Sequence, residues 1–190
     1  IASTVAVTYD NQYTKHDYLI RSIDANNMIT IDSIYTLMGY SYKTTKTAGF
    51  FSINHKFSKK TIMKAGINLD VYNFNMIDSV LNTGHTAFYK RWDYQGVAAL
   101  IQPFVQWKWR VSDNMDVTAG IHAQYFTLTN SISPFEPRLG WKYKMDNGQA
   151  VFAGGGLHSM IQPYYTYAYK VLPGQAMGPN SNMKMDFSRS

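Results

Sequence analysis

The chain has 190 residues, of which 45% are hydrophobic, 16% charged and 15% aromatic. Its longest unbroken apolar run covers residues 97–101, which excludes a membrane-spanning helix of roughly 18 or more apolar residues, and the lack of cysteine excludes disulfide scaffolds, cysteine-ligated zinc and thiol catalysis. The 15 Tyr and 10 Phe favour strands. Glu136 is the only glutamate, and the other acidic residues are Asp, which favours turns over helices. The composition predicts an all-β protein.

Alternation of apolar and polar side chains predicts a series of strands, each with one apolar and one polar face. The pattern appears over residues 1–9 and 51–57, is strongest over 62–72, 97–111 and 115–125, and continues over 138–144 and, less cleanly, 150–158. The strongest segments exceed the typical soluble strand of about 5 to 6 residues. They reach the roughly 9 to 11 residues that a strand needs to cross a bilayer.

The connections alternate between short and long. Short polar turns lie at residues 58–60, 112–114 and 146–148, the last being Asp146-Asn147-Gly148, a strong hairpin signal. Longer, aromatic-rich connections are expected over residues 73–96, over 128–134 and after Met160. Short turns at one end and long loops at the other are typical of an antiparallel transmembrane β-barrel.

The two parities differ as the wall of such a barrel would. Large aromatic residues of the apolar parity gather beside the short turns, as in a girdle at the headgroup layer, whereas a soluble antiparallel sandwich, the other architecture with alternation, does not require that placement. Because Pro103 cannot donate to a ladder, we expect a bulge there. We expect Met63, Ile67, Leu69, Val105, Trp107, Ile121, Leu139 and Trp141 to face lipid, and Asn68, Gln106, Gln124 and Arg138 to face the lumen.

The sequence contains no catalytic constellation, and we expect neither enzymatic activity nor a cofactor. The five histidines never pair at a spacing of four residues, and Gly154-Gly155-Gly156 is not followed by the Lys and helix of a phosphate-binding loop. The formal net charge of +6 is spread over strand parities and turns, which disfavours nucleic acid as a partner. The positive belt, comprising Lys64, Lys108, Arg110, Lys142 and Lys144, shares the polar parity near the short turns.

Candidate ligand contacts lie in the expected long loops and on the polar parity. Tyrosine and tryptophan rings can stack on sugars or flat chelates, and arginine can bind anionic groups. Packing of the loops on themselves is an equally good reading of these aromatic residues. The candidate ligand-binding residues are Tyr89, Arg91, Trp92, Tyr94, Arg138, Tyr164 and Tyr165, with Phe88, Tyr167 and Tyr169 in the same loops.

Several phrases in order carry a family resemblance. They are FSINHKF at 51–57 followed by KAG at 64–66, FEPRLG at 135–140, GGLHSMIQP at 155–163 and MDFSRS at 185–190. From about residue 45 onward the chain resembles the barrel of TonB-dependent outer-membrane receptors of the Bacteroidetes type with a carboxypeptidase-regulatory-like domain. The resemblance implies a barrel of roughly 22 strands with a plugged lumen, energy coupling through TonB, and import of a siderophore, cobalamin, glycan or peptide.

Neither the plug nor the TonB box is recognisable in residues 1–190. At about 15 to 20 residues for each strand and its turns, the chain supplies about eight to ten strands. We therefore expect residues 1–190 to be one β-barrel segment of a larger plugged barrel in the outer membrane. We also expect its sheet to stay open, with residues 1–9 not paired to the final strand. The alternative is a complete small outer-membrane barrel with a structural or adhesin-like role.

Overall fold

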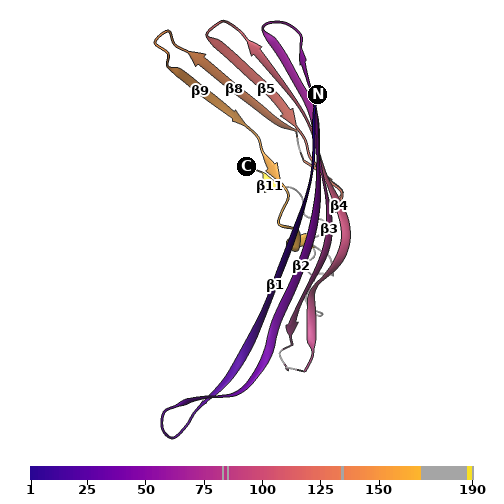
Figure 1. Ribbon diagram of the computed structural model, residues 1–190, viewed down its shortest axis with the longest axis vertical. Helices are drawn as coiled ribbons and strands as arrows, with labels where there is room; N and C mark the ends of the chain where they lie inside the picture. Colours follow the sequence, from indigo (N-terminus) through magenta and orange to yellow (C-terminus); the bar gives the residue numbers. More distant parts are fainter. Residues whose placement is uncertain (83, 85, 134, 168–187, 190) are drawn as a thin grey trace.

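The computed structural model describes residues 1–82, 84, 86–133, 135–167 and 188–189. Within them the fold is all-β and antiparallel, as predicted, and forms a curved nine-stranded sheet and a separate two-stranded one (Figure 1). The elements are β1 (Ala2–Ile23), β2 (Ile29–Lys56), β3 (Thr61–Leu81), β4 (Phe88–Arg110), β5 (Met115–His122), β6 (Tyr125–Phe126), β7 (Ser131–Ile132), β8 (Glu136–Lys144), β9 (Ala150–Gly156), β10 (Ser159–Met160), α1 (Tyr164–Tyr167) and β11 (Ser188–Arg189).

The main sheet is a meander. Its strand order is β1-β2-β3-β4-β5-β8-β9, so each long strand pairs with the next one in the sequence, while β6 and β7 form a short excursion beside β4. The three short turns form as predicted. They are closed by backbone bonds from Phe57 to Thr61 (3.0 Å), from Val111 to Met115 (2.8 Å) and from Met145 to Gln149 (2.8 Å). All three turns lie at one end of the sheet (Figure 1).

The prediction of a long loop over residues 73–96 is wrong. β3 continues to Leu81 and β4 begins at Phe88, so both strands run far beyond the segment that the alternation marked. The apolar parity changes at this point: Val71 ends the odd series, and Tyr72, Phe74 and Met76 continue on the even positions. A strand whose apolar side chains change face loses its single-parity pattern, although its backbone stays in the same register.

The register confirms the predicted sorting into two faces. Met63 lies opposite Trp107 and Val105 opposite Ile121, whereas Gln106 lies opposite Lys64 on the other parity. Trp107 pairs with Ala119 and Arg110 with Asp116, so these two residues of β4 lie on opposite faces, as expected. We call these the apolar face and the polar face. The segment that follows β9 lies on the concave side of the sheet (Figure 1). Since this segment packs against residues of the polar face, the polar face is the concave one.

The expected bulge at Pro103 is absent, because Pro103 pairs with Ile67 without a register shift. Its carbonyl accepts a hydrogen bond from the backbone N–H of Ala123 at 3.2 Å. Since N–H and C=O of one strand residue point to the same side, the ring nitrogen of Pro103 faces residues 123–124, where β5 has ended and β6 has not begun. The donor that proline lacks therefore falls at an interruption of the ladder.

The hydrophobic core lies on the polar face, around the ends of β3 and β4 that are far from the short turns. Its buried members are Tyr72, Phe74, Met76, Ala98, Leu100, Phe126 and Tyr167. Phe74 stacks on Tyr72 at 5.7 Å, and Tyr164 of α1 covers Phe74 at 5.0 Å. The core thus joins β3 and β4 to the excursion through β6 and to α1.

The sheet is open. In the described part of the chain β1 pairs with β2 alone, β9 pairs with β8 alone, and β11 pairs with β10. Residues 1–9 are therefore not hydrogen-bonded to the last described strand, as we expected. Within these residues both β1 and β9 present free backbone edges.

Replacing Phe74 by Ala is expected to lower the free energy of unfolding by about 3–5 kcal/mol, because it leaves a cavity under α1. Phe135→Ala is the matched control, since Phe135 is 72% exposed and Phe74 is fully buried. Chemical unfolding followed by tryptophan fluorescence measures both changes. Equal losses in the two variants would contradict the placement of the core.

Candidate binding site

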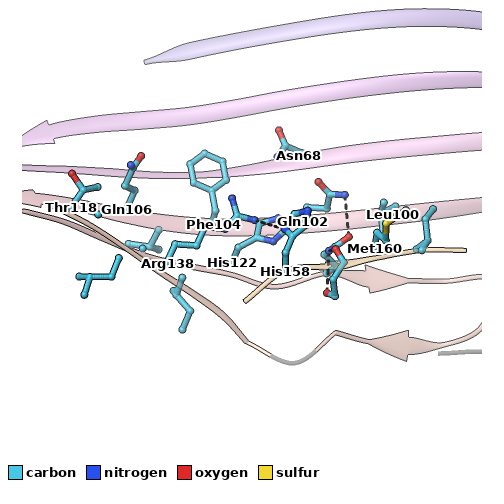
Figure 2. A pocket seen from close by; sticks show the side chains of 18 of the residues that line it. Asn68, Leu100, Gln102, Phe104, Gln106, Thr118, His122, Arg138, His158 and Met160 are labelled. Atoms are coloured by element: carbon cyan, nitrogen blue, oxygen red, sulfur yellow. Dashed lines mark hydrogen bonds between the residues drawn. The ribbon is translucent and has the colours of Figure 1, made fainter. Parts of the chain in front are cut away.

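An open pocket of about 750 Å³ lies on the polar face, over β3, β4, β5 and β8. Figure 2 shows the side chains of Asn68, Gln106, Arg138, His122 and His158 around it. The register explains how they meet, because Lys64, Gln106, Gly120, Arg138 and Gly156 lie opposite one another on successive strands. Gly120 leaves the middle of this row without a side chain, and Gly140 does the same opposite Thr118 in a neighbouring row. The strands themselves therefore form the floor of the pocket.

Glu136, the first residue of β8, is the centre of a buried polar network at one end of the pocket. It is 1% exposed, and antiparallel pairing places it directly opposite His122. Its carboxylate accepts hydrogen bonds from His122 Nδ1 (2.9 Å), from Gln124 Nε2 (2.9 Å) and from the hydroxyl of Ser159. A carboxylate with this many donors has its lone pairs satisfied, which offsets the cost of burial.

Gln124 links Glu136 to the segment after β9. Its amide donates to the carbonyl of Ser159 at 2.6 Å, and its backbone N–H donates to the hydroxyl of Ser133 at 2.8 Å. Gln124 lies in the interruption between β5 and β6, where its backbone is released from the ladder. The interruption opposite Pro103 therefore allows Gln124 to turn onto Glu136.

Arg138 and His158 form the exposed side of the network. Arg138 Nη2 lies 3.3 Å from Glu136 Oε2 and 3.0 Å from His158 Nδ1. Because Nδ1 accepts this bond, the proton of a neutral His158 ring lies on Nε2, which remains a donor. Both bonds of Arg138 use Nη2, and its side chain is 51% exposed, so the rest of the guanidinium is accessible to a ligand.

The structure places the predicted ligand residues in three ways. Arg138 and Tyr164 both line the pocket. Tyr165 belongs to α1, but its side chain lies outside the described part of the chain, as does all of Tyr169. The others, Tyr89, Arg91, Trp92 and Tyr94, lie in β4 and not in a loop, which corrects the expected placement. Whether any of them contacts a ligand stays a prediction.

Arg91 has a structural partner. The register between β3 and β4 shifts between Asp78 and Ser79, so Arg91 is the extra residue of a bulge. Its Nη2 lies 2.7 Å from the fully buried Asp78, and its guanidinium lies over the ring of Trp92 at 5.2 Å. Trp92 in turn packs edge-on against Tyr42 at 5.6 Å. These contacts favour a structural role for Arg91 and Trp92, which pack within the sheet around a buried charge pair.

The positive belt lies on the polar face between the pocket and the short turns. Asp116 lies 3.3 Å from Lys108 and 3.8 Å from Arg110, so one acid serves two cations. Lys64 Nζ lies 5.4 Å from the centre of the Phe50 ring and 5.6 Å from that of the Phe104 ring, and Lys142 lies over Phe152 at 4.9 Å. Aromatic rings hold these ammonium groups without neutralising them, so the face keeps a positive charge.

The sequence reasoning missed Glu136, Gln124 and Ser159 as one network. The signal was the solitary glutamate, which has the same parity as Arg138. Among the described residues no cluster of histidine and acidic side chains fits a metal ion, and no helix in that part of the chain is long and apolar enough to cross a bilayer. No family model and no curated protein matches the sequence.

Replacing Glu136 by Gln is expected to lower the free energy of unfolding by roughly 1.5–3 kcal/mol, because bonds to a charged group are lost and one amide proton then faces donors. Asp113→Asn is the control, since Asp113 lies exposed in a short turn. Thermal unfolding of both variants measures the difference. An unchanged Glu136→Gln variant would show that the network does not hold β8 to the segment after β9.

Proposed function

We propose that the chain is a β-barrel segment of an outer-membrane, TonB-dependent receptor that imports a nutrient. In this proposal the apolar face contacts lipid, the polar face lines the lumen, and residues outside this sequence supply the plug and the remaining strands. The single observation that carries the proposal is the separation of the two faces: an exposed apolar surface backs directly onto a charged, glycine-floored pocket.

The apolar face has no covering layer in the described part of the chain. Leu139 is 61% exposed, Ile121 44% and Trp141 38%, and they lie on neighbouring strands. A soluble protein rarely leaves so continuous an apolar surface in water, whereas hydrocarbon solvates it.

The aromatic side chains beside the short turns support the same orientation. Phe57 stacks on Trp107 at 5.2 Å, Trp107 contacts Trp109 at 5.7 Å, and Trp141 stacks on Tyr143 at 6.1 Å. Rings with one polar edge are favoured at the boundary between hydrocarbon and headgroups. The short turns then lie on the periplasmic side.

The free edges of β1 and β9 support a larger barrel over the alternative of a complete small one with a structural or adhesin-like role. In hydrocarbon each unpaired backbone group costs several kcal/mol, so a sheet in this environment must close. The transport role rests on the sequence resemblance. It makes the lipid bilayer, the TonB complex (through the plug) and a small or oligomeric nutrient the partners.

Single cysteines can test the orientation, because residues 1–190 contain no cysteine and any cysteine elsewhere in the full-length protein can first be replaced by serine. Val105 and Gln106 are neighbours on β4 and point to opposite faces. In the full-length protein in native outer-membrane vesicles, a spin label at Val105→Cys is expected to collide with oxygen dissolved in lipid. A label at Gln106→Cys is expected to collide with a water-soluble nickel chelate.

The two labels control for each other, since they differ by one residue. Similar exposure of both labels to the nickel chelate would overturn the lipid assignment. The reversed pattern would overturn the register of the two faces.

The transport role can be tested by deleting the gene in its host. The deletion strain is expected to lose growth on one nutrient supplied as sole source from a panel of iron chelates, cobalamin, glycans and peptides. A strain that lacks TonB should lose growth on the same nutrient, because import against a gradient needs energy coupling. Loss in the deletion strain that is independent of TonB would favour a passive or structural role.

A further inference from the structure

We infer that the pocket on the polar face binds a ligand that carries a carboxylate on a hydroxyl-rich body, the chemistry of an acidic saccharide. The inference rests on the proposed function, because it names the class of nutrient that the same face would take. It is carried by three features of the pocket: its exposed donors, its neutral amides and its rings.

The exposed groups at one end of the pocket are hydrogen-bond donors, and one of them, Arg138, carries a positive charge. Glu136 is buried and its oxygens already accept several bonds, so the acid cannot take a ligand donor. The free part of the Arg138 guanidinium and Nε2 of His158 remain. The N–H groups on Nε and Nη1 of Arg138 can each donate to an anionic oxygen, and such charge-assisted hydrogen bonds are stronger than neutral ones.

The electrostatic surroundings favour the same charge. Lys64 lies 5.6 Å from the centre of the Phe104 ring, which lines the pocket, and Lys108 lies near the glycine floor. Among the described residues, none of the side chains that line the pocket is acidic. The buried Glu136 lies 3.3 Å from Arg138, and Asp116 lies 3.3 Å from Lys108. The field that remains at the pocket is that of Lys64, which lies over aromatic rings and not over a carboxylate.

The remaining walls suit hydroxyl groups and a ring. Asn68, Gln102 and Gln106 supply neutral amides, which both donate and accept. The rings of Phe104 and Tyr164 border the same space and can cover the apolar side of a sugar ring. A volume of about 750 Å³ has room for two or three sugar units.

The glycine floor makes close approach possible. A Cβ at Gly120 would lie 3.3 Å from the carbonyl of Val105, and one at Gly140 would lie 3.9 Å from the carbonyl of Thr118. Glycines within strands often mark a place where a ligand approaches the backbone closely.

Calorimetry on the full-length protein in detergent micelles tests the inference with four probes. Trigalacturonic acid and 3′-sialyllactose are acidic saccharides, maltotriose is neutral, and triglutamate is an acidic peptide. We expect at least one acidic saccharide to bind at least tenfold more tightly than maltotriose and triglutamate. Tighter binding of maltotriose or triglutamate would overturn the assigned ligand class. If none of the four probes binds, the pocket is not a ligand site, for example because polypeptide covers it.

Arg138→Gln is expected to weaken binding of the acidic saccharide roughly ten- to hundredfold, the effect of losing a hydrogen bond to a charged group. Arg110→Gln is the matched control, because Arg110 lies on the same face with similar exposure, 54% against 51%. Unchanged affinity in Arg138→Gln, or an equal loss in both variants, would overturn the site. Circular dichroism checks that both variants fold.

The labelling experiment separates the two proposals. If Val105→Cys reports lipid and no acidic saccharide binds, the inference about the pocket fails and the membrane proposal stands. If an acidic saccharide binds through Arg138 and both labels report water, the membrane proposal fails and the pocket stands.

Discussion

The period of two in a β-strand is the constraint on which this structure depends. A residue in a strand can reach one face only, and antiparallel pairing carries that choice to its neighbour on the next strand. Between β2 and β3 the register runs without a shift from Lys56 opposite Ile62 to Met38 opposite Val80. Side chains of one parity therefore form the outward apolar face. Side chains of the other parity, which are far apart in the sequence, meet at the pocket over β3, β4, β5 and β8.

The predictable part of the fold follows from that constraint. Residues such as Met63, Val105 and Ile121 were assigned to a common face from parity alone, and Asp146-Asn147-Gly148 marked its turn because Gly148 takes a positive φ of 82°. The alternation failed where it changed parity after Val71. Tyr72, Phe74 and Met76 are buried because α1 and β6 cover this part of the concave face. Local alternation cannot predict a contact with α1, which lies about 90 residues further along the chain.

The binding site was only partly predictable for the same reason. Parity assigned Arg138 and Gln124 to the same face, and both line the pocket. Parity does not predict Ser159, which comes from the segment after β9 and joins Glu136 and Gln124 through long-range contacts. At Pro103 the sequence predicts a bulge, and the structure has a gap in the neighbouring strand instead. The N–H that proline lacks would point toward β5 and β6 and not toward β3.

The meander order also sets a sequence of folding events. Neighbouring strands are joined by short connections from β1 to β5, so each hairpin closes a short loop and can add to the last one formed. The contact between Gln124 and Ser159 spans 35 residues and needs β8 and β9 in place first. The polar network around Glu136 is therefore complete only once the segment after β9 has packed, and a chain that stops before β9 would keep the apolar residues of β1 to β8 but lack the contacts of Ser159.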